Sequence, residues 1–262
     1  MVQIIDIRVA PEEVNDTRYH IEIARNELNI KFDSKVEVRV LKRSIDARKR
    51  YVVYQLRIEV YIDEPMPLQL YDLPVTKKIS SHNEAVVVGA GPAGLFAALQ
   101  LIKNNIKPIV IERGRAVRER RRDLAAINQK HIVNPESNYC FGEGGAGTFS
   151  DGKLYTRSNK RGDVNEVLET LVRFGASEEI LVDAHPHIGT NKLPKIIEAI
   201  REYIIACGGE VLFDSKLTDI ILENKEVKGV VINGSRTLPI SNLILATGHS
   251  ARDIFELLHK KN

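Results

Sequence analysis

The sequence predicts an α/β chain in two parts: a small α+β domain over residues 1–80, and a larger part over residues 81–262 in which helices cover a parallel sheet. Three observations carry this prediction. Strand and helix patterns alternate from Glu84 onward, a glycine-rich turn joins the first strand of that region to its first helix, and a strand–helix–strand–strand pattern precedes it. A run with Pro65, Pro67 and Pro74 separates the two parts, so we place the boundary near residue 80.

The N-terminal part begins with a strand over residues 2–9. Apolar residues then recur at helical spacing through Ile21, Ala24 and Leu28. Two alternating segments follow, one at Val36, Val38 and Val40 and one over residues 54–62. This order, βαββ, is typical of a small α+β domain.

A basic stretch over residues 43–50 joins the last two strands as a hairpin. Its tip, with Arg43, Arg48, Lys49 and Arg50, is a candidate nucleic-acid or partner contact. We favour a solvated hairpin end, because the segment around it is nearly charge-balanced and no aromatic residues are interleaved at the tip.

The larger part alternates strands with helices. Strands are expected at 85–89, 107–112, 210–214, 218–223, 227–232 and 242–247, and helices at 92–104, 115–128, 164–174 and 193–207. An irregular glycine-rich loop occupies residues 138–153. The first two strands and the helix between them form a βαβ unit, the building block of a parallel sheet.

Composition excludes several classes of protein. The 262 residues are 43% hydrophobic and 28% charged, which rules out a disordered or collagen-like chain. The net charge of +3 is too small to indicate nucleic acid or a membrane surface as the partner. Cys140 and Cys207 lie far apart and form no C-x-x-C, and no signal peptide is evident, so we expect a cytoplasmic protein. The uncharged stretch 85–102 contains three glycines and a proline, which favour strand, turn and helix over a membrane span.

The strongest motif is a G-x-G-x-x-G that follows a predicted strand and opens a helix. Its glycines are Gly89, Gly91 and Gly94. The first permits the tight turn, the second lets the backbone approach a diphosphate, and the third lets the helix lie close to the strand. The helix N-terminus supplies N–H groups and positive dipole to the diphosphate. This pattern is typical of a Rossmann-like dinucleotide site.

An acidic residue strengthens the assignment. Glu112 ends the second strand, where a carboxylate can accept both hydroxyls of an adenosine ribose. Such an acid disfavours a ribose 2′-phosphate, but the adjacent Arg113 could tolerate one. The spacing alone therefore leaves the kind of dinucleotide open.

Two later segments narrow the choice: the loop Gly142-Glu-Gly-Gly-Ala-Gly-Thr148, and Leu245-Ala-Thr-Gly248 after an apolar strand. With the first fingerprint they resemble flavoproteins of the glutathione-reductase type, which have two dinucleotide-binding domains and in which a strand ending in A-T-G returns close to the FAD. The segment 141–155, together with His185-Pro-His-Ile-Gly-Thr190 and Ala246-Thr-Gly-His-Ser-Ala-Arg-Asp253, is similar to the bacterial FAD-dependent dehydrogenase family. The resemblance spans residues 84–262, and the small N-terminal domain also fits that family.

The resemblance implies a set of FAD-binding residues. The diphosphate would lie against the fingerprint and the ribose against Glu112, with Arg113 beside it. The glycine loop would pass near the diphosphate or ribityl chain, with residues 150–153 closer to the isoalloxazine, and Leu217 would reach the adenine through its backbone. The complete set is Gly89, Gly91, Pro92, Ala93, Gly94, Glu112, Arg113, Gly144, Gly145, Thr148, Leu217, Ala246, Thr247 and Gly248.

Catalytic residues are less evident. His185, His187, His249 and Lys153 lie near motifs that such a fold brings toward the flavin. His185-x-His187 lacks a third ligand at metal-binding spacing, so no metal is expected. Cys140 could face the flavin, but it has no second cysteine of the kind that a disulfide reductase uses, and we interpret it as a buried small residue.

Five arginines between residues 115 and 122 form a further basic run, namely Arg115, Arg118, Arg120, Arg121 and Arg122. They could bind an acidic substrate or an NADPH phosphate. We favour a solvated helix face.

These observations favour a FAD-dependent oxidoreductase that moves hydride through the flavin, with NAD(P)H as a candidate donor and a small molecule as substrate. Flavoproteins of this type continue to a C-terminal G-D motif, so we expect this chain to correspond to roughly the first half of one, with an incomplete flavin domain. The alternatives are a flavoprotein or nucleotide-binding module without turnover, for example one associated with RNA, and an NAD(P)-binding dehydrogenase without flavin. Neither a nucleic acid nor a membrane is expected as a partner.

Overall fold

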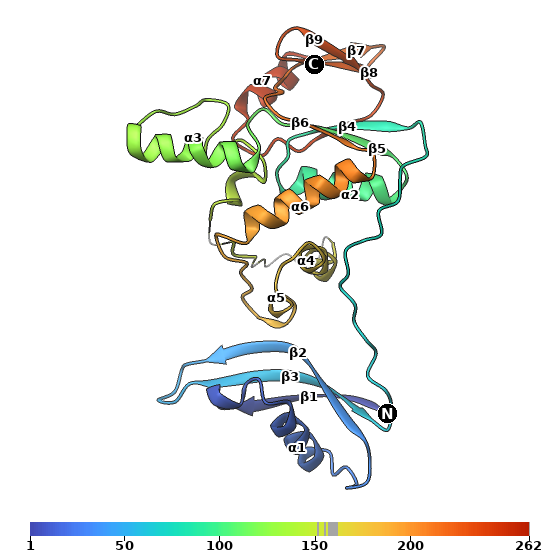
Figure 1. Ribbon diagram of the computed structural model, residues 1–262, viewed down its shortest axis with the longest axis vertical. Helices are drawn as coiled ribbons and strands as arrows, with labels where there is room; N and C mark the ends of the chain where they lie inside the picture. The colour runs from blue at the N-terminus through green and yellow to red at the C-terminus, as the bar shows by residue number, and fades with distance from the viewer. Residues whose placement is uncertain (151, 155, 157–161, 262) are drawn as a thin grey trace. The chain divides into compact units, whose positions relative to one another are not determined.

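The computed structural model describes residues 1–150, 152–154, 156 and 162–261, and the chain forms two compact units (Figure 1). One unit comprises Met1–Leu73 and Lys153–Ile188, and the other comprises Pro74–Gly152 and Gly189–Asn262. These bounds differ from a single boundary near residue 80, because the segment 153–188 belongs to the first unit. Within that unit the Arg43 Nε donates a hydrogen bond to Asp183 Oδ1 at 2.7 Å, and this joins the segment to a strand of the N-terminal sheet.

The first unit contains the predicted βαββ order. Its elements are β1 (Val2–Val9), a 3-10 turn (Pro11–Glu13), α1 (Thr17–Glu27), β2 (Val36–Asp46) and β3 (Val53–Ile62), followed later in the chain by α4 (Val164–Arg173) and α5 (Glu179–Val182). The strands form an antiparallel sheet in the order β1-β3-β2. Helix α1 begins where the Asp16 carboxylate accepts the N–H groups of Arg18 and Tyr19, the usual N-cap arrangement.

The core of this unit lies between the sheet and α1. Ile7, Leu56 and Ile58 are almost completely buried, and Ala24 of α1 packs against the same cluster. The alternation of strand residues therefore has the physical cause that the sequence suggests: one face of the sheet packs against a helix.

The basic hairpin differs from the prediction in one respect. Strand β2 continues to Asp46, so Arg43 lies in the strand and pairs with Asp183 instead of standing at the tip. At the tip, Arg48 binds Asp46 through two nitrogens, and the Arg50 guanidinium lies 5.6 Å from the Tyr51 ring.

The second unit contains the predicted parallel sheet. Its elements are β4 (Glu84–Val88), α2 (Pro92–Lys103), β5 (Lys107–Ile111), α3 (Val117–Lys130), a 3-10 turn (Gly145–Gly147), α6 (Leu193–Ala206), β6 (Glu210–Leu212), β7 (Leu217–Glu223), β8 (Glu226–Ile232), β9 (Arg236–Pro239), β10 (Leu243–Leu245) and α7 (Arg252–Lys260). The strands β10, β4, β5 and β6 pair in parallel in that order, and β7-β8-β9 form an antiparallel sheet. This arrangement confirms the predicted Rossmann-like α/β class.

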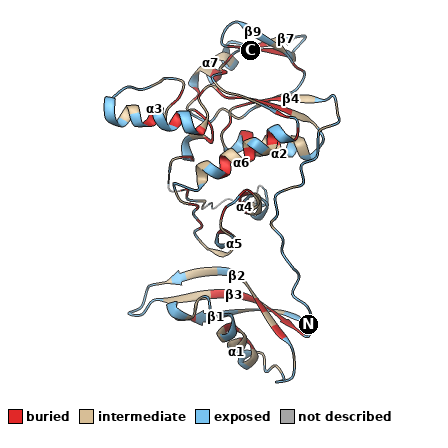
Figure 2. Cartoon of the chain, in the orientation of Figure 1, coloured by how far each residue is buried: buried red, intermediate tan, exposed pale blue. Residues whose placement is uncertain are grey.

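Both faces of the parallel sheet are covered. Helices α2 and α6 lie on one face, and the small antiparallel sheet with α7 covers the other (Figure 1). The buried residues of β4 and of the inward sides of α2 and α6 appear in red in Figure 2. Val86 and Ile111 of the parallel sheet share one buried cluster with Ile232 of the antiparallel sheet and Ile254 of α7. Because all four strands of the sheet run in parallel, the loops that follow β4, β5 and β10 meet at one edge.

Three elements, α5, β9 and α7, were not predicted from the sequence. Helix α7 has nine residues, of which Ile254 and Leu257 pack against the core of this unit, and so short a periodic pattern is hard to recognise in isolation. In the part of the chain that the structure describes, no helix combines the length and apolar character needed to cross a membrane.

Candidate dinucleotide-binding site

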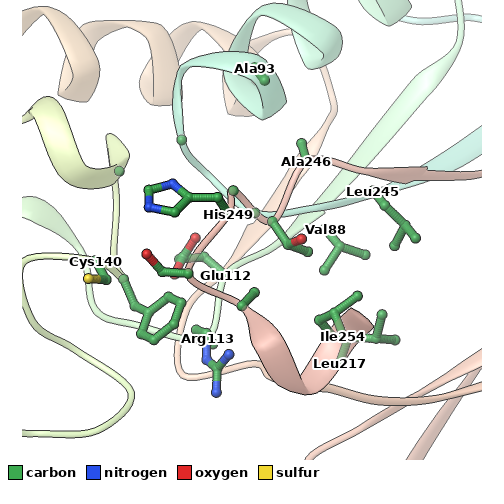
Figure 3. Close-up of a pocket in the computed structure, with 18 of the residues that line it drawn as sticks. Val88, Ala93, Glu112, Arg113, Cys140, Leu217, Leu245, Ala246, His249 and Ile254 are labelled. Atoms are coloured by element: carbon green, nitrogen blue, oxygen red, sulfur yellow. The ribbon is translucent and has the colours of Figure 1, made fainter. Parts of the chain in front are cut away.

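A pocket of about 440 Å³ lies at the edge of the sheet where β4, β5 and β10 end. Its walls come from the fingerprint turn, the end of β5, the glycine loop, the start of β7 and the segment from β10 into α7. Figure 3 shows that Val88, Leu217, Leu245 and Ile254 line one side, whereas Glu112, Arg113 and His249 line the other. A pocket with an apolar side and a polar side suits a ligand that carries both an aromatic ring and hydrophilic groups.

The fingerprint turn is fixed by backbone contacts with two neighbouring strands. Gly89 has φ +106°, a conformation that residues with a side chain rarely adopt, and a Cβ there would lie 2.5 Å from the Ala246 carbonyl oxygen. The Gly89 N–H donates to the Ile111 carbonyl at 2.8 Å, and the Ala246 N–H donates to the Val88 carbonyl at 2.9 Å. The A-T-G segment after β10 therefore lies directly against the turn.

Helix α2 points its N-terminus at the pocket. Its N-cap residue, Gly91, has no side chain to cap the first turn, and Pro92 and Ala93 also line the cavity. The first N–H groups of a helix have no partner within it, so they are available to an anion. A Cβ on Gly91 would meet nothing closer than the Gly145 Cα, at 3.8 Å, so the space beside this residue is open.

Glu112 connects the turn to the glycine loop. The buried carboxylate accepts the N–H of Ala90 at 2.8 Å through Oε2, and the N–H groups of Gly114 and Gly142, each at 2.9 Å, through Oε1. A carboxylate offers about four acceptor positions. Three serve the backbone, so Glu112 shapes the pocket in addition to the ribose contact that the sequence predicts.

The Arg120 side chain of α3 holds the glycine loop by hydrogen bonds to its backbone carbonyls. This residue is 1% exposed, and its guanidinium donates to the carbonyls of Asn138, Tyr139, Gly142, Glu143 and Gly145 and to the Thr148 hydroxyl. The interpretation of the arginine run as a solvated face is therefore wrong for Arg120. Its hydrogen bonds satisfy the carbonyls of a loop that has no regular structure of its own.

The carboxylate of Glu143 attaches the same loop to two helices. It is fully buried, accepts the Val117 N–H at 2.7 Å at the start of α3, and pairs with Arg201 of α6 at 2.8 Å. Burial raises the pKa of Glu143, and the bonds from Val117 and Arg201 oppose that effect. The loop is thus tied to two helices as well as to the fingerprint, where the Gly144 N–H donates to the Ala90 carbonyl at 2.8 Å.

Four charged side chains form a closed set beside Glu112, and we call them the charge cluster: Arg113, Glu136, Lys216 and Asp253. Arg113 donates to Glu136 at 2.5 Å and to Asp253 at 3.0 Å, while Lys216 lies 2.9 Å from Glu136 and 3.2 Å from Asp253. Burial raises the pKa of both carboxyls, but the two cations outweigh it and hold each pKa below its ordinary value. Both carboxyls are therefore ionised near neutral pH.

The structure brings most of the predicted cofactor residues to one cavity. The pocket lining includes Gly89, Gly91, Pro92, Ala93, Glu112, Arg113, Gly145, Leu217, Ala246, Thr247 and Gly248. Three do not line it. Gly94 lies in the first turn of α2 and faces Gly89 and Val87. Gly144 and Thr148 face each other within the glycine loop. The roles of all fourteen residues as ligands of FAD stay predictions.

The catalytic candidates separate into two groups. His249 lines the pocket, whereas Lys153, His185 and His187 belong to the first unit, where Lys153 and His187 pair as an isolated β-bridge. Residue 151, which was expected near the isoalloxazine, lies outside the described residues, and Gly152 is described. Among the described residues, no group of three or more His, Cys, Asp or Glu side chains could hold a metal ion.

Some pocket residues escaped sequence reasoning. Cys140 is exposed and lines the cavity, so the expectation of a buried residue is wrong; Cys207 is the buried cysteine. Phe141 carries the Arg113 guanidinium 4.2 Å above its ring. Lys216 and the residues of α7 carry no motif that signals a site, and only the packing of α7 brings Phe255 and Leu258 to the pocket.

Comparison with known proteins gives one match to a family model and matches to curated proteins. Residues 1–61 match the model of a domain of unknown function, DUF8436. Over 250 residues the chain is 38% identical to an uncharacterized protein of Clostridium beijerinckii, covering 90% of this chain and 46% of that protein. It is 27% identical over 155 residues to the thiamine thiazole synthase of Aeropyrum pernix, covering 59% of this chain and 45% of the synthase.

Two further matches concern shorter or more distant similarity. A dual trans-enoyl reductase/FAD-dependent monooxygenase of Aspergillus terreus is 42% identical over 52 residues, which are 20% of this chain and 7% of that protein. The crystal structure of THI4 from Thermovibrio ammonificans superimposes with a TM-score of 0.43 at 19% identity, covering 68% of this chain and 62% of that structure. The chain spans about half the length of the first two curated relatives.

Proposed function

We propose that this chain is the FAD-binding portion of a flavin-dependent oxidoreductase. One observation carries the proposal: the G-x-G-x-x-G turn, the glycine loop and the A-T-G segment, which lie far apart in the sequence, border one pocket at the carboxyl edge of a parallel sheet. Dinucleotides bind at this edge in open α/β sheets. The similarity of a 52-residue stretch to a protein described as a FAD-dependent monooxygenase supports the same cofactor.

The residues present fit the two halves of an adenine dinucleotide. The uncapped first turn of α2 and the open space beside Gly91 would receive the diphosphate. Glu112 retains about one acceptor position for a ribose hydroxyl. The apolar side of the pocket, which includes Val88 and Ile254, would contact the adenine. Leu217 begins β7 at that side, in the position where we expect a backbone contact to the adenine.

The bound flavin would supply hydride transfer, and the protein would supply position and electrostatics. His249, which lines the pocket, is the catalytic candidate that this geometry favours. A small-molecule substrate, NAD(P)H as electron donor and a cytoplasmic location belong to the same proposal. We do not assign a role to His185, His187 or Lys153 in it, because they belong to the other unit.

A pair of glycine variants tests the proposal. Gly91→Ala adds a methyl group into open space, so we expect the fold to be kept, but the methyl group would occupy the approach of the diphosphate. Overpacking of this kind costs about 1–3 kcal/mol, which is roughly 5- to 150-fold in Kd. Gly147→Ala is the matched control, because a Cβ there meets nothing within 4 Å and Gly147 does not line the pocket.

The measurement is titration of each purified chain with FAD, followed by its flavin absorbance and fluorescence, with the thermal midpoint as a check on folding. The proposal predicts saturable FAD binding to the wild-type chain and to Gly147→Ala, and weakened binding to a folded Gly91→Ala. Absence of FAD binding to a folded wild-type chain would contradict the proposal, as would binding that Gly91→Ala leaves unchanged.

A further inference from the structure

The charge cluster places two cations at the ribose end of the pocket and commits both of them to carboxylates. Arg113 and Lys216 line the cavity, and Arg113 directly follows Glu112 at the end of β5. Lys216 is held at the same place, because the Ser215 N–H donates to the Glu112 carbonyl at 2.9 Å. Cations beside the acidic residue of a dinucleotide fingerprint are the groups that accommodate a ribose 2′-phosphate.

Both cations already have carboxylate partners. Arg113 uses Nε for Glu136 and Nη1 for Asp253, and its guanidinium carbon lies 4.2 Å from the centre of the Phe141 ring, so three contacts hold it in place. Its side chain is only 14% exposed. Lys216 lies between the same two carboxylates. The cluster has two positive and two negative charges, so it offers no net attraction to a phosphate dianion.

A 2′-phosphate would also meet repulsion. At Arg113 or Lys216 it would lie beside the carboxylates of Glu136 and Asp253 and compete with them for the same cations, and a carboxylate that it displaced would be partly buried without its partner. Glu112 adds a third negative group at the same end of the pocket. Rejection by uncompensated charge is an effective means of specificity, because it acts against one ligand without weakening the other.

We propose that Glu136 and Asp253 are specificity-determining residues, which hold Arg113 and Lys216 so that the pocket accepts an adenine dinucleotide with a free ribose 2′-hydroxyl and rejects one with a 2′-phosphate. This inference rests on the proposed function, because it concerns the adenosine end of the same pocket. It adds that the two cations are excluded from phosphate binding by their own carboxylate partners, and that removal of these partners would release them.

The test compares two ligands that differ only in the 2′-phosphate: ADP-ribose and 2′-phospho-ADP-ribose. Each is titrated calorimetrically into the full chain, alongside FAD. The wild-type chain is expected to bind ADP-ribose at least about tenfold more tightly than its 2′-phosphorylated form, a difference of about 1.4 kcal/mol. In Glu136→Gln/Asp253→Asn this preference is expected to shrink at least about tenfold, while FAD binding stays within about threefold of wild type.

Further variants keep the test decisive. Adding Lys216→Met to the double variant removes one released cation and is expected to abolish the gained affinity for the 2′-phosphate. Glu226→Gln is the matched control, because Glu226 is an exposed carboxylate paired with Lys228 on β8 and does not line the pocket. If the double variant does not fold, the single variant Glu136→Gln is expected to show the same change in preference, to a smaller extent.

The outcomes separate this inference from the proposed function. Wild-type binding of FAD without discrimination between the two ribose ligands overturns the inference and leaves the proposed function intact. A preference that is the same in the wild-type chain and in the folded carboxamide variants also overturns it. A folded wild-type chain that binds neither FAD nor ADP-ribose overturns the proposed function, and the inference with it.

Discussion

The third glycine of the fingerprint sets the distance between helix α2 and strand β4. A Cβ added at Gly94 would lie 1.8 Å from the Gly89 carbonyl oxygen and 3.4 Å from Val87 Cγ1. Real Cβ atoms essentially never approach a heavy atom closer than 3.0 Å, so in Gly94→Ala the helix and the turn must separate by about 1.2 Å at this point. The contact is with backbone, which cannot rotate away as a side chain can.

The expected loss of stability follows from this clash. Overpacking costs about 1–3 kcal/mol, and the rigid contact places Gly94→Ala at the upper end of that range. Alanine is the better helix former by about 1 kcal/mol, which offsets part of the cost. The net loss is therefore about 2 kcal/mol, which lowers the thermal midpoint by roughly 4–8 °C for a protein of this size. FAD binding should weaken as well, because the displaced turn carries Gly89 and Gly91.

Thermal unfolding followed by circular dichroism measures the first effect, and FAD titration measures the second. Gly147→Ala, in the glycine loop but outside the pocket lining, is the control, and it should change the free energy of unfolding by no more than about 0.5 kcal/mol, as for a surface substitution. A Gly94→Ala chain with the midpoint and FAD affinity of the wild type would refute the close approach of α2 to β4 as the reason for a glycine here.

Three other predictions concern the loop, the thiols and the charge cluster. Arg120→Met leaves buried loop carbonyls without donors and should destabilise the chain by about 2–4 kcal/mol, whereas Arg121→Met, at an exposed position of the same helix, should change stability little; thermal unfolding compares them. Cys140 should react with a thiol reagent in the folded chain and be protected by FAD, whereas Cys207 should react only after unfolding. Both carboxyls of the charge cluster have a lowered pKa in the folded chain, so their stabilisation is complete above the ordinary carboxyl pKa and is lost as the pH falls through the folded values. The double carboxamide variant should therefore lose less stability than wild type between about pH 5 and pH 2, measured by thermal midpoints.

Each of these has a result that contradicts it. Equal stability of the two arginine variants would mean that the loop does not depend on its buried guanidinium. Reaction of Cys140 that FAD leaves unaffected would place this thiol away from the bound cofactor. Parallel acid-unfolding curves for the wild-type chain and the carboxamide variant would show that the charge cluster does not have the lowered pKa values on which that prediction depends.

The sequence determined the order of the elements and the position of the fingerprint. Alternating apolar residues predicted the strands of the βαββ pattern, because a strand that packs one face shows period two. A continuous apolar run predicted β4, because a strand buried on both faces is apolar throughout. The fingerprint glycines can also be recognised in the sequence, because local geometry requires them. Gly89 has the backbone conformation of the turn, and Gly94 lets the helix contact Gly89, five positions before it. Such constraints act over a few residues, so a single sequence reveals them.

Tertiary structure alone decided the burial of Arg120, the partners of Arg113 and the presence of Cys140 and Lys216 in the pocket. Arg120 looks like its exposed neighbours in the sequence, yet it is buried, because the loop 138–148 folds over that side of α3 and its carbonyls need donors. The pairing of Arg113 with Asp253 joins residues 140 positions apart, and only the packing of α7 in this unit creates it. Long-range partners of this kind leave no periodic or local trace in one sequence. They depend on tertiary packing, which here determines which charged groups line the pocket and which stabilise the fold.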